Sequence, residues 1–196
     1  MTQALSVAVI VLSVLVLGLI AAVFALARQV GILYERIAPV GALTMDAGPK
    51  VGEPAPVLDL EALGGETLAI GRAGPTSTLL FFLSPTCPVC KKLLPILKST
   101  LRSEHAWLRI VLASDGDEAA QQKFRASAKL EMFPYVLSAP LGLAFKVSRL
   151  PYAVLLDEHG RVRAKGLVNS REQIESLFTA KELGVATVQE YLGATH

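Results

Sequence analysis

"TSTLLFFLSPTCPVCKKLLPIL", residues 76–97, is the stretch that decides the fold of this chain. Residues 76–84 form a continuous apolar run of strand length, which is typical of a central strand buried on both faces. From Pro88 onward the apolar residues recur at helical spacing. The two halves meet at Cys87-Pro88-Val89-Cys90, which holds both cysteines of the chain. The stretch therefore predicts a strand, a cysteine pair and a helix in immediate succession.

The spacing of the two cysteines favours redox chemistry. A structural disulfide between residues this close closes a tiny loop and removes little entropy from the unfolded chain. Cys87 falls at the start of the predicted helix, where unpaired N–H groups and the helix dipole stabilise a thiolate, the reactive form of cysteine. Cys90, one turn further on, is placed to attack a mixed disulfide on Cys87. We expect a dithiol/disulfide pair that acts without another cofactor.

A zinc site is the main alternative for a CxxC sequence, and it needs further ligands. The only histidines are His105, His159 and His196, and none of them is paired at ligand spacing. We therefore expect no metal. The formal net charge of +2 selects neither nucleic acid nor an acidic partner.

The N-terminal region predicts a membrane anchor. Residues 4–27 are almost wholly apolar and carry no charge, and about 20 such residues span a bilayer as a helix. The alternative is a cleaved signal peptide, because residues 25–27 have a small-x-small sequence. The apolar run exceeds the usual ~7–15 residues of a signal core, however, and no Lys or Arg precedes it. We expect an anchor helix in residues 1–34 and a linker rich in Gly and Pro in residues 35–50.

The remaining chain predicts an α/β domain with a central sheet, covering residues 51–182, and a C-terminal extension at residues 183–196. Ser170 is a candidate N-cap. The expected elements after the first helix are a strand at 107–114, a helix at 115–130, a strand at 135–138, a helix at 140–147, two antiparallel strands within 152–168 and a helix at 170–183.

With these elements in place, the chain resembles the thioredoxin fold in three local features. Pro95 follows Cys90 by five residues, as does the proline that kinks the active-site helix of thioredoxins. Pro151 precedes a strand, a turn and a second strand, where thioredoxins carry a cis-proline. Residues 51–60, "VGEPAPVLDL", resemble the opening of membrane-tethered thioredoxins of the TlpA and ResA type. The resemblance implies a thioredoxin-like α/β fold with a mixed central sheet flanked by helices, and a cis Pro151 that presents backbone to a client near the cysteines.

Residues 81–95, "FFLSPTCPVCKKLLP", and residues 112–117, "LASDGD", together with the anchor, resemble the MauD family of methylamine utilisation proteins. That resemblance implies a thiol–disulfide oxidoreductase that assists maturation of the small (beta) subunit of methylamine dehydrogenase, its client. It also implies a single-pass inner-membrane protein with its C-terminal domain in the periplasm and an unidentified membrane redox partner. Arg28 and Arg36 follow the anchor, and the positive-inside rule alone would place the domain in the cytoplasm.

One departure from thioredoxins bears on mechanism. Phe81 occupies the position of their buried aspartate, six residues before the first cysteine, and Cys90 is therefore expected to lack an internal base. Three functions remain open at this level: disulfide formation or rearrangement, disulfide reduction of the cytochrome c maturation type, and client binding by a chaperone without redox chemistry.

Overall fold

The computed structural model describes residues 3, 6, 10, 12, 13, 15–24 and 48–183. Residues 15–24 are helical, and their large apolar side chains are exposed. Within the described part of the chain, no helix has both the length and the hydropathy required to cross a bilayer. The predicted anchor at 1–34 and linker at 35–50 lie largely outside the described residues and remain predictions, as does the extension at 183–196.

Five strands form the central sheet in the order β5-β4-β3-β6-β7. The three strands β3, β4 and β5 are parallel to one another, whereas β6 is antiparallel to β3 and to β7. The mixed sheet is the one that the thioredoxin resemblance implies. The strands are β3 (Ser77–Phe82), β4 (Leu108–Ser114), β5 (Tyr135–Leu137), β6 (Tyr152–Leu156) and β7 (Val162–Leu167).

The middle strand, β3, is apolar throughout because both faces of the sheet are covered. Leu79 and Phe81 point into one core, and Leu80 and Phe82 point into the other. This alternation follows from the two-residue period of a strand. The continuous apolar run in the sequence is therefore explained by burial on both faces.

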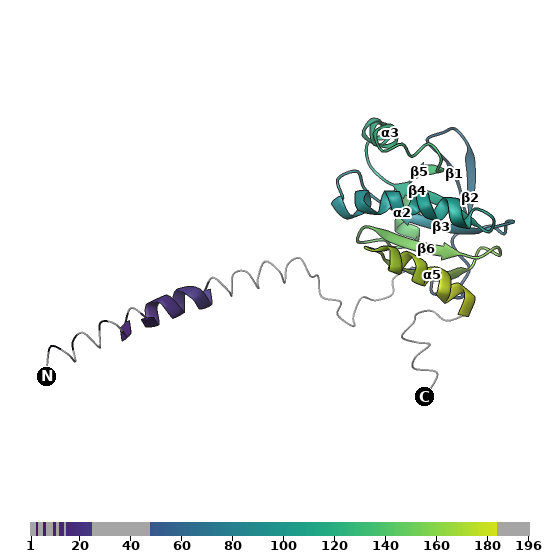
Figure 1. Cartoon of the computed structure of the whole chain (residues 1–196). Helices are drawn as coiled ribbons and strands as arrows, with labels where there is room; N and C mark the ends of the chain where they lie inside the picture. The colour runs from purple at the N-terminus through teal and green to yellow at the C-terminus, as the bar shows by residue number, and fades with distance from the viewer. Residues whose placement is uncertain are drawn as a thin grey trace. The chain divides into compact units, whose positions relative to one another are not determined.

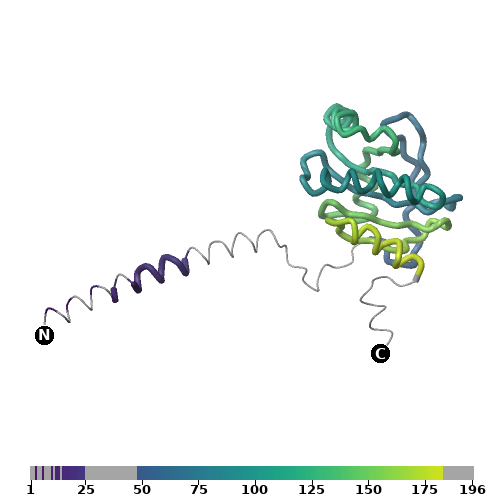
Figure 2. Tube along the Cα trace, viewed as in Figure 1, coloured from purple at the N-terminus to yellow at the C-terminus, as the bar shows by residue number. Residues whose placement is uncertain are grey.

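Three helices cover the first face: α2 (Pro88–Glu104), α3 (Glu118–Ser127) and α5 (Arg171–Leu183). Their buried side chains join the core that contains Phe81. In Figures 1 and 2 the teal helix α2 and the yellow helix α5 run across this face, with β6 seen beside α5. Helical connections between parallel strands are right-handed. Since β3, β4 and β5 follow one another in one direction across the sheet, the two connecting helices, α2 and α3, lie on the same face.

The second face is covered by a hairpin of β1 (Leu58–Glu61) and β2 (Thr67–Ile70) and by the short helix α4 (Ala139–Ala144). Before β1, the chain pairs with the β6–β7 turn through a bridge between Pro54 and Arg161. After β1, it reaches the opposite edge of the sheet, where Ala62 bridges to Val136 of β5. The separate strand β2 was not predicted from the sequence.

Local capping explains where the helices begin. The Asp117 carboxylate accepts the N–H of Ala120 and starts α3, so this helix is shorter than the predicted 115–130. The Ser138 hydroxyl accepts the N–H of Leu141 at the start of α4. Ser170 accepts the N–H of Gln173, which confirms it as the cap of α5.

Candidate functional site

The cysteine pair lies where β3 passes into α2. Ser84 and Thr86 shape the connecting turn, because their hydroxyls are 2.9 Å apart and the Thr86 N–H donates to the Ser84 hydroxyl. The N–H of Cys87 then donates to the Ser84 carbonyl at 3.1 Å. Pro88 occupies the first turn of α2, where its missing N–H costs no helical hydrogen bond.

Cys87 is the N-cap of α2. Its backbone is extended (φ −82°, ψ 113°), and its Sγ accepts the N–H of Cys90 at 3.2 Å. The side chain is half-buried, and both cysteines are free thiols in this structure. A sulfur atom in this position faces the positive end of the helix dipole.

Cys90 differs from Cys87 in its surroundings. It is 0% exposed and packs among apolar side chains, Phe81 and Leu93 included. Burial, with the hydrogen bond to Cys87 as the second cause, raises the pKa of the Cys90 thiol to about 12. Within residues 48–183, no carboxylate forms a hydrogen bond with either cysteine. Phe81, at the position of the thioredoxins' aspartate, instead packs in the same apolar core as Cys90.

A buried polar cluster behind Cys90 was missed by the sequence analysis. The Tyr135 hydroxyl donates to Gln121 Oε1, and Gln121 Nε2 donates to the Ser114 hydroxyl at 2.9 Å. All three side chains are buried. Burial raises the pKa of Tyr135 to about 12, and negative charge on Cys90 contributes in the same direction. Tyr135 starts β5, α3 carries Gln121 and Ser114 ends β4, so no local sequence signal connects them to the cysteines.

Pro151 lies at the same end of the sheet as the cysteine pair. The Leu150–Pro151 bond is cis, which confirms the prediction. β6 begins at the next residue, and Tyr152 pairs with Phe82, the last residue of β3. The Pro151 carbonyl accepts the N–H of Val168 at 3.2 Å, and Leu150 is partly exposed beside it.

The residues of this site are of the kinds that carry out disulfide exchange. It combines an accessible sulfur at a helix N-terminus, a second sulfur behind it and a cis-proline at the same end of the sheet. Within the described residues, no group of three His, Cys, Asp or Glu side chains lies together in a way that could hold a metal ion.

A thioredoxin fold with a dithiol at the start of its first long helix defines the class of thioredoxin-like thiol–disulfide oxidoreductases. The family model described as thioredoxin-like matches residues 74–162. Among solved structures, StoA from Bacillus subtilis is 26% identical with a TM-score of 0.55, over 64% of this chain and 97% of that one. A putative thiol:disulfide interchange protein DsbE from Chlorobium tepidum shares the fold, with a TM-score of 0.62 at 18% identity, over 68% of this chain and 99% of that one. Members of this class use a dithiol/disulfide pair and generally need no other cofactor.

Closer relatives narrow the class to one family. The methylamine utilization protein MauD of Paracoccus denitrificans is 43% identical over 99% of this chain and 97% of its own length. The protein of the same name from Methylorubrum extorquens is 46% identical over 92% of this chain and 84% of its own length. The chain belongs to the MauD family.

Proposed function

We propose that this chain is a membrane-tethered oxidoreductase of methylamine utilisation that forms or rearranges disulfides in the small subunit of methylamine dehydrogenase. The observation that carries the chemistry is the contrast between the two sulfurs. Cys87 is partly accessible at the N-cap of α2, and Cys90 is buried behind it. The name of the relatives supports the pathway, and the client is the one that the family resemblance implies.

Disulfide formation takes two exchange steps. A client thiolate attacks Cys87 Sγ of the oxidised pair, so that a mixed disulfide forms and Cys90 leaves as a thiolate, which takes up a proton. A second client thiolate then attacks the client sulfur of the mixed disulfide and releases Cys87. The client loses two electrons, and the cysteine pair gains them. An electron acceptor in the membrane, the unidentified redox partner, returns the pair to the disulfide.

The buried environment of Cys90 affects the lifetime of the mixed disulfide once it has formed. A reductase needs Cys90 to attack the mixed disulfide on Cys87, and only the thiolate does so. With a pKa of about 12 and no internal base, Cys90 stays protonated near neutral pH. Slow resolution by Cys90 leaves the mixed disulfide available to a second thiol of the client, which gives formation or rearrangement of client disulfides. The reductase of the cytochrome c maturation type is the second candidate.

Pro151 is proposed to hold the client beside Cys87. Its own carbonyl is already bonded to the N–H of Val168, so the backbone of Leu150 is the part left to pair with an extended client segment. We further propose that residues 1–34 anchor the chain in the inner membrane, that the domain faces the periplasm, and that the dithiol acts without another cofactor. The uncharged run at residues 4–27 supports the anchor.

Trapping in a host that carries the methylamine system tests the function. The Cys90→Ser chain should accumulate a mixed disulfide between Cys87 and the dehydrogenase small subunit, because the resolving sulfur is gone. The matched Cys87→Ser chain should form none. Non-reducing gels and mass spectrometry of the adduct provide the measurement.

Three results would count against the function. Trapping through Cys90 alone would reverse the two roles. No adduct from either variant, with maturation of the dehydrogenase intact in both, would favour a chaperone without redox chemistry. A wild-type pair found mainly as dithiol after acid quenching, with c-type cytochromes lost on deletion, would favour the reductase.

A further inference from the structure

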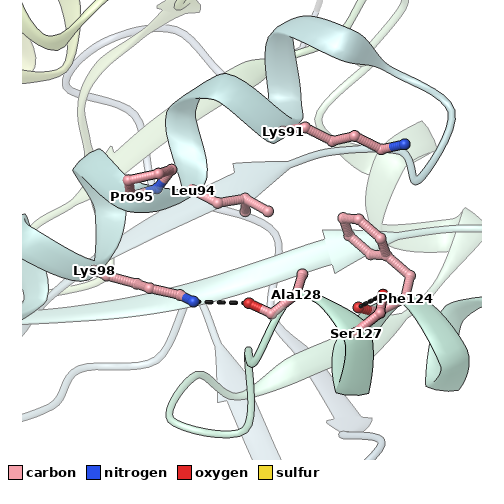
Figure 3. A pocket seen from close by; sticks show the side chains of 7 residues that line it. All are labelled: Lys91, Leu94, Pro95, Lys98, Phe124, Ser127 and Ala128. Atoms are coloured by element: carbon pink, nitrogen blue, oxygen red, sulfur yellow. Dashed lines mark hydrogen bonds between the residues drawn. The ribbon is translucent and has the colours of Figure 1, made fainter.

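A groove of about 420 Å³ runs between α2 and α3. Figure 3 shows α2 contributing Lys91, Leu94, Pro95 and Lys98, which face Phe124 and the end of α3. The groove has an apolar floor and basic side chains along the α2 side.

The groove-lining residues of α2 include a stripe that is in line with Cys87 at the start of the helix. Cys87, Lys91, Leu94 and Lys98 are separated by four, seven and eleven positions, which is the spacing of residues on a single helical stripe. At 1.5 Å per residue, Lys91 lies about 6 Å and Leu94 about 11 Å along the axis from Cys87. An extended chain advances about 3.3 Å per residue. A chain bonded to Cys87 and lying in the groove would thus place its second residue at Lys91 and its third or fourth at Leu94.

The charge of the groove selects its occupant. Lys98 is committed internally, because its Nζ donates to the Ala128 carbonyl at 2.7 Å (Figure 3). Lys91 is exposed, and no carboxylate of the described residues forms an ion pair with it. The groove lining contains two lysines and no acidic residue. An anionic side chain near Lys91 would therefore meet an uncompensated positive charge.

Pro95 adds a backbone acceptor at the same place. Proline has no N–H, so the carbonyl of Lys91 loses its α-helical donor. Lys91 and Pro95 both line the groove. A carbonyl without its helical donor is available to an N–H from outside the helix.

We infer that the α2–α3 groove is a specificity site that binds the client segment next to the exchanging cysteine, an inference that rests on the proposed function. The preferred segment has a carboxylate two residues from its cysteine and an apolar side chain three or four residues away. The carboxylate pairs with Lys91, the peptide N–H bonds to the Lys91 carbonyl, and the apolar side chain packs on Leu94, Pro95 and Phe124.

Exchange rates measured on the full chain test this selection. The substrates are short peptides Cys-Gly-Asp-Leu-Leu, Cys-Gly-Lys-Leu-Leu and Cys-Gly-Asp-Ser-Ser, each made in both chain directions. Each carries its cysteine as a mixed disulfide with 5-thio-2-nitrobenzoate. Cys87 of the reduced Cys90→Ser chain attacks the peptide sulfur and releases the coloured thiolate, which is followed by absorbance. The Asp-Leu-Leu peptide should react about threefold faster than the Lys peptide, the size expected of one exposed ion pair. It should also react faster than the Asp-Ser-Ser peptide, which lacks the apolar contact.

Two charge-reversal variants distinguish binding in the groove from the general electrostatic effect of the positive charge on α2. Lys91→Glu should invert the preference between the Asp and Lys peptides, and about 0.5 M salt should weaken it. Lys92→Glu is the matched control, because Lys92 is also exposed but does not line the groove. It should keep the wild-type order. Equal shifts in both variants, or no preference in the wild type, would overturn the inference.

A measurement without thiol chemistry keeps the groove testable if Cys87 proves unreactive. Fluorescently labelled peptides with serine in place of cysteine should bind the full chain more weakly after Ser127→Trp, which narrows the groove. Lys92→Glu, outside the groove, should bind the same peptides as the wild type does. Peptide binding seen only after truncation at residue 183 would assign the groove to the C-terminal segment. Peptide binding that is lost as the chain self-associates would assign the groove to a second copy. Either result would overturn the inference.

Discussion

At the scale of single residues, the main feature is the polar cluster of Tyr135, Gln121 and Ser114 inside an otherwise apolar core. Buried polar groups are stable there only when they are paired, and each of these has a partner. Gln121 Nε2 also donates to the Asp115 carbonyl at 2.7 Å, which ties the start of α3 to the end of β4. The cluster therefore fixes the structure behind Cys90.

Tyr135→Phe should destabilise the fold by about 1–3 kcal/mol at pH 7, because Gln121 Oε1 loses its donor in a buried place. The effect should depend on pH. The pKa of Tyr135 is raised from 10 to about 12 in the folded chain, so its contribution is complete below pH 10 and is lost as pH rises through about 12. Urea unfolding of both chains from pH 7 upward measures this. An unchanged stability at pH 7 would mean that the hydroxyl bond contributes nothing.

At the scale of elements, the β6–β7 turn depends on close backbone packing. Asp157 Oδ1 accepts the N–H groups of His159 and Arg161, and Gly160 between them has φ +73°. A Cβ at Gly160 would lie 2.2 Å from the carbonyl oxygen of Gly71. The turn therefore requires glycine for its conformation and for its contact.

Gly160→Ala should cost more than about 2 kcal/mol of unfolding free energy, since the left-handed conformation alone costs an L residue about 1–2 kcal/mol. Gly142→Ala, in helix α4, is the matched control. A Cβ there meets no atom within 4 Å, so alanine should be neutral or stabilising by up to about 1 kcal/mol. Thermal unfolding of the two variants gives the comparison. Similar melting temperatures would contradict the account of the turn.

Helix α5 is fixed to the sheet by Lys181. Its Nζ donates to Glu158 Oε1 and to the Ser77 hydroxyl, each at 2.6 Å, and it lies 4.8 Å from the centre of the Trp107 ring. These bonds lower the pKa of Glu158 to about 2, with Lys181 the largest cause. The stabilisation is therefore present above the ordinary pKa of 4.5 and is lost as pH falls through about 2.

Lys181→Met should reduce stability at pH 7 by about 1 kcal/mol or less, because the pair is partly open to solvent. The difference from wild type should shrink as pH falls from about 4.5 to about 2. Denaturant unfolding at several pH values measures it, and Lys129→Met serves as an exposed control. A difference that stays constant down to pH 2 would point to lost packing on Trp107 instead.

At the scale of the whole molecule, the chain divides into two compact units, Met1–Met45 and Asp46–His196. All of the chemistry described above belongs to the second unit. The first unit contains the proposed anchor, which would determine the compartment in which that chemistry takes place.

A reporter fusion tests the compartment. Alkaline phosphatase joined after His196 should be active, because that enzyme needs the oxidising periplasm to form its disulfides. A cytoplasmic reporter at the same point should be inactive. The opposite pair of results would mean that Arg28 and Arg36 set the orientation. N-terminal sequencing of the mature chain should find residues 4–27 retained, whereas a start at Arg28 would show a cleaved signal peptide.

Local patterns in the sequence predicted most elements of the domain. The run at residues 76–84 predicted β3, and the apolar spacing after Pro88 predicted α2, because strand and helix periods are properties of neighbouring residues. The class of the fold and the cis Leu150–Pro151 bond came from the resemblance around Cys87, Pro95 and Pro151. No local pattern indicated the separate strand β2, whose partner β1 lies across a turn.

By itself, the sequence determined that a strand and a helix meet at a reactive cysteine pair, because capping and helix polarity act within a few residues. The tertiary structure alone decided the environment of that pair. Burial gives Cys90 its high pKa, β5 and α3 bring Tyr135 and Gln121 behind it, and α3 closes the groove beside Lys91. Each of these depends on contacts between residues far apart in the chain, which exist only once the sheet has assembled around β3.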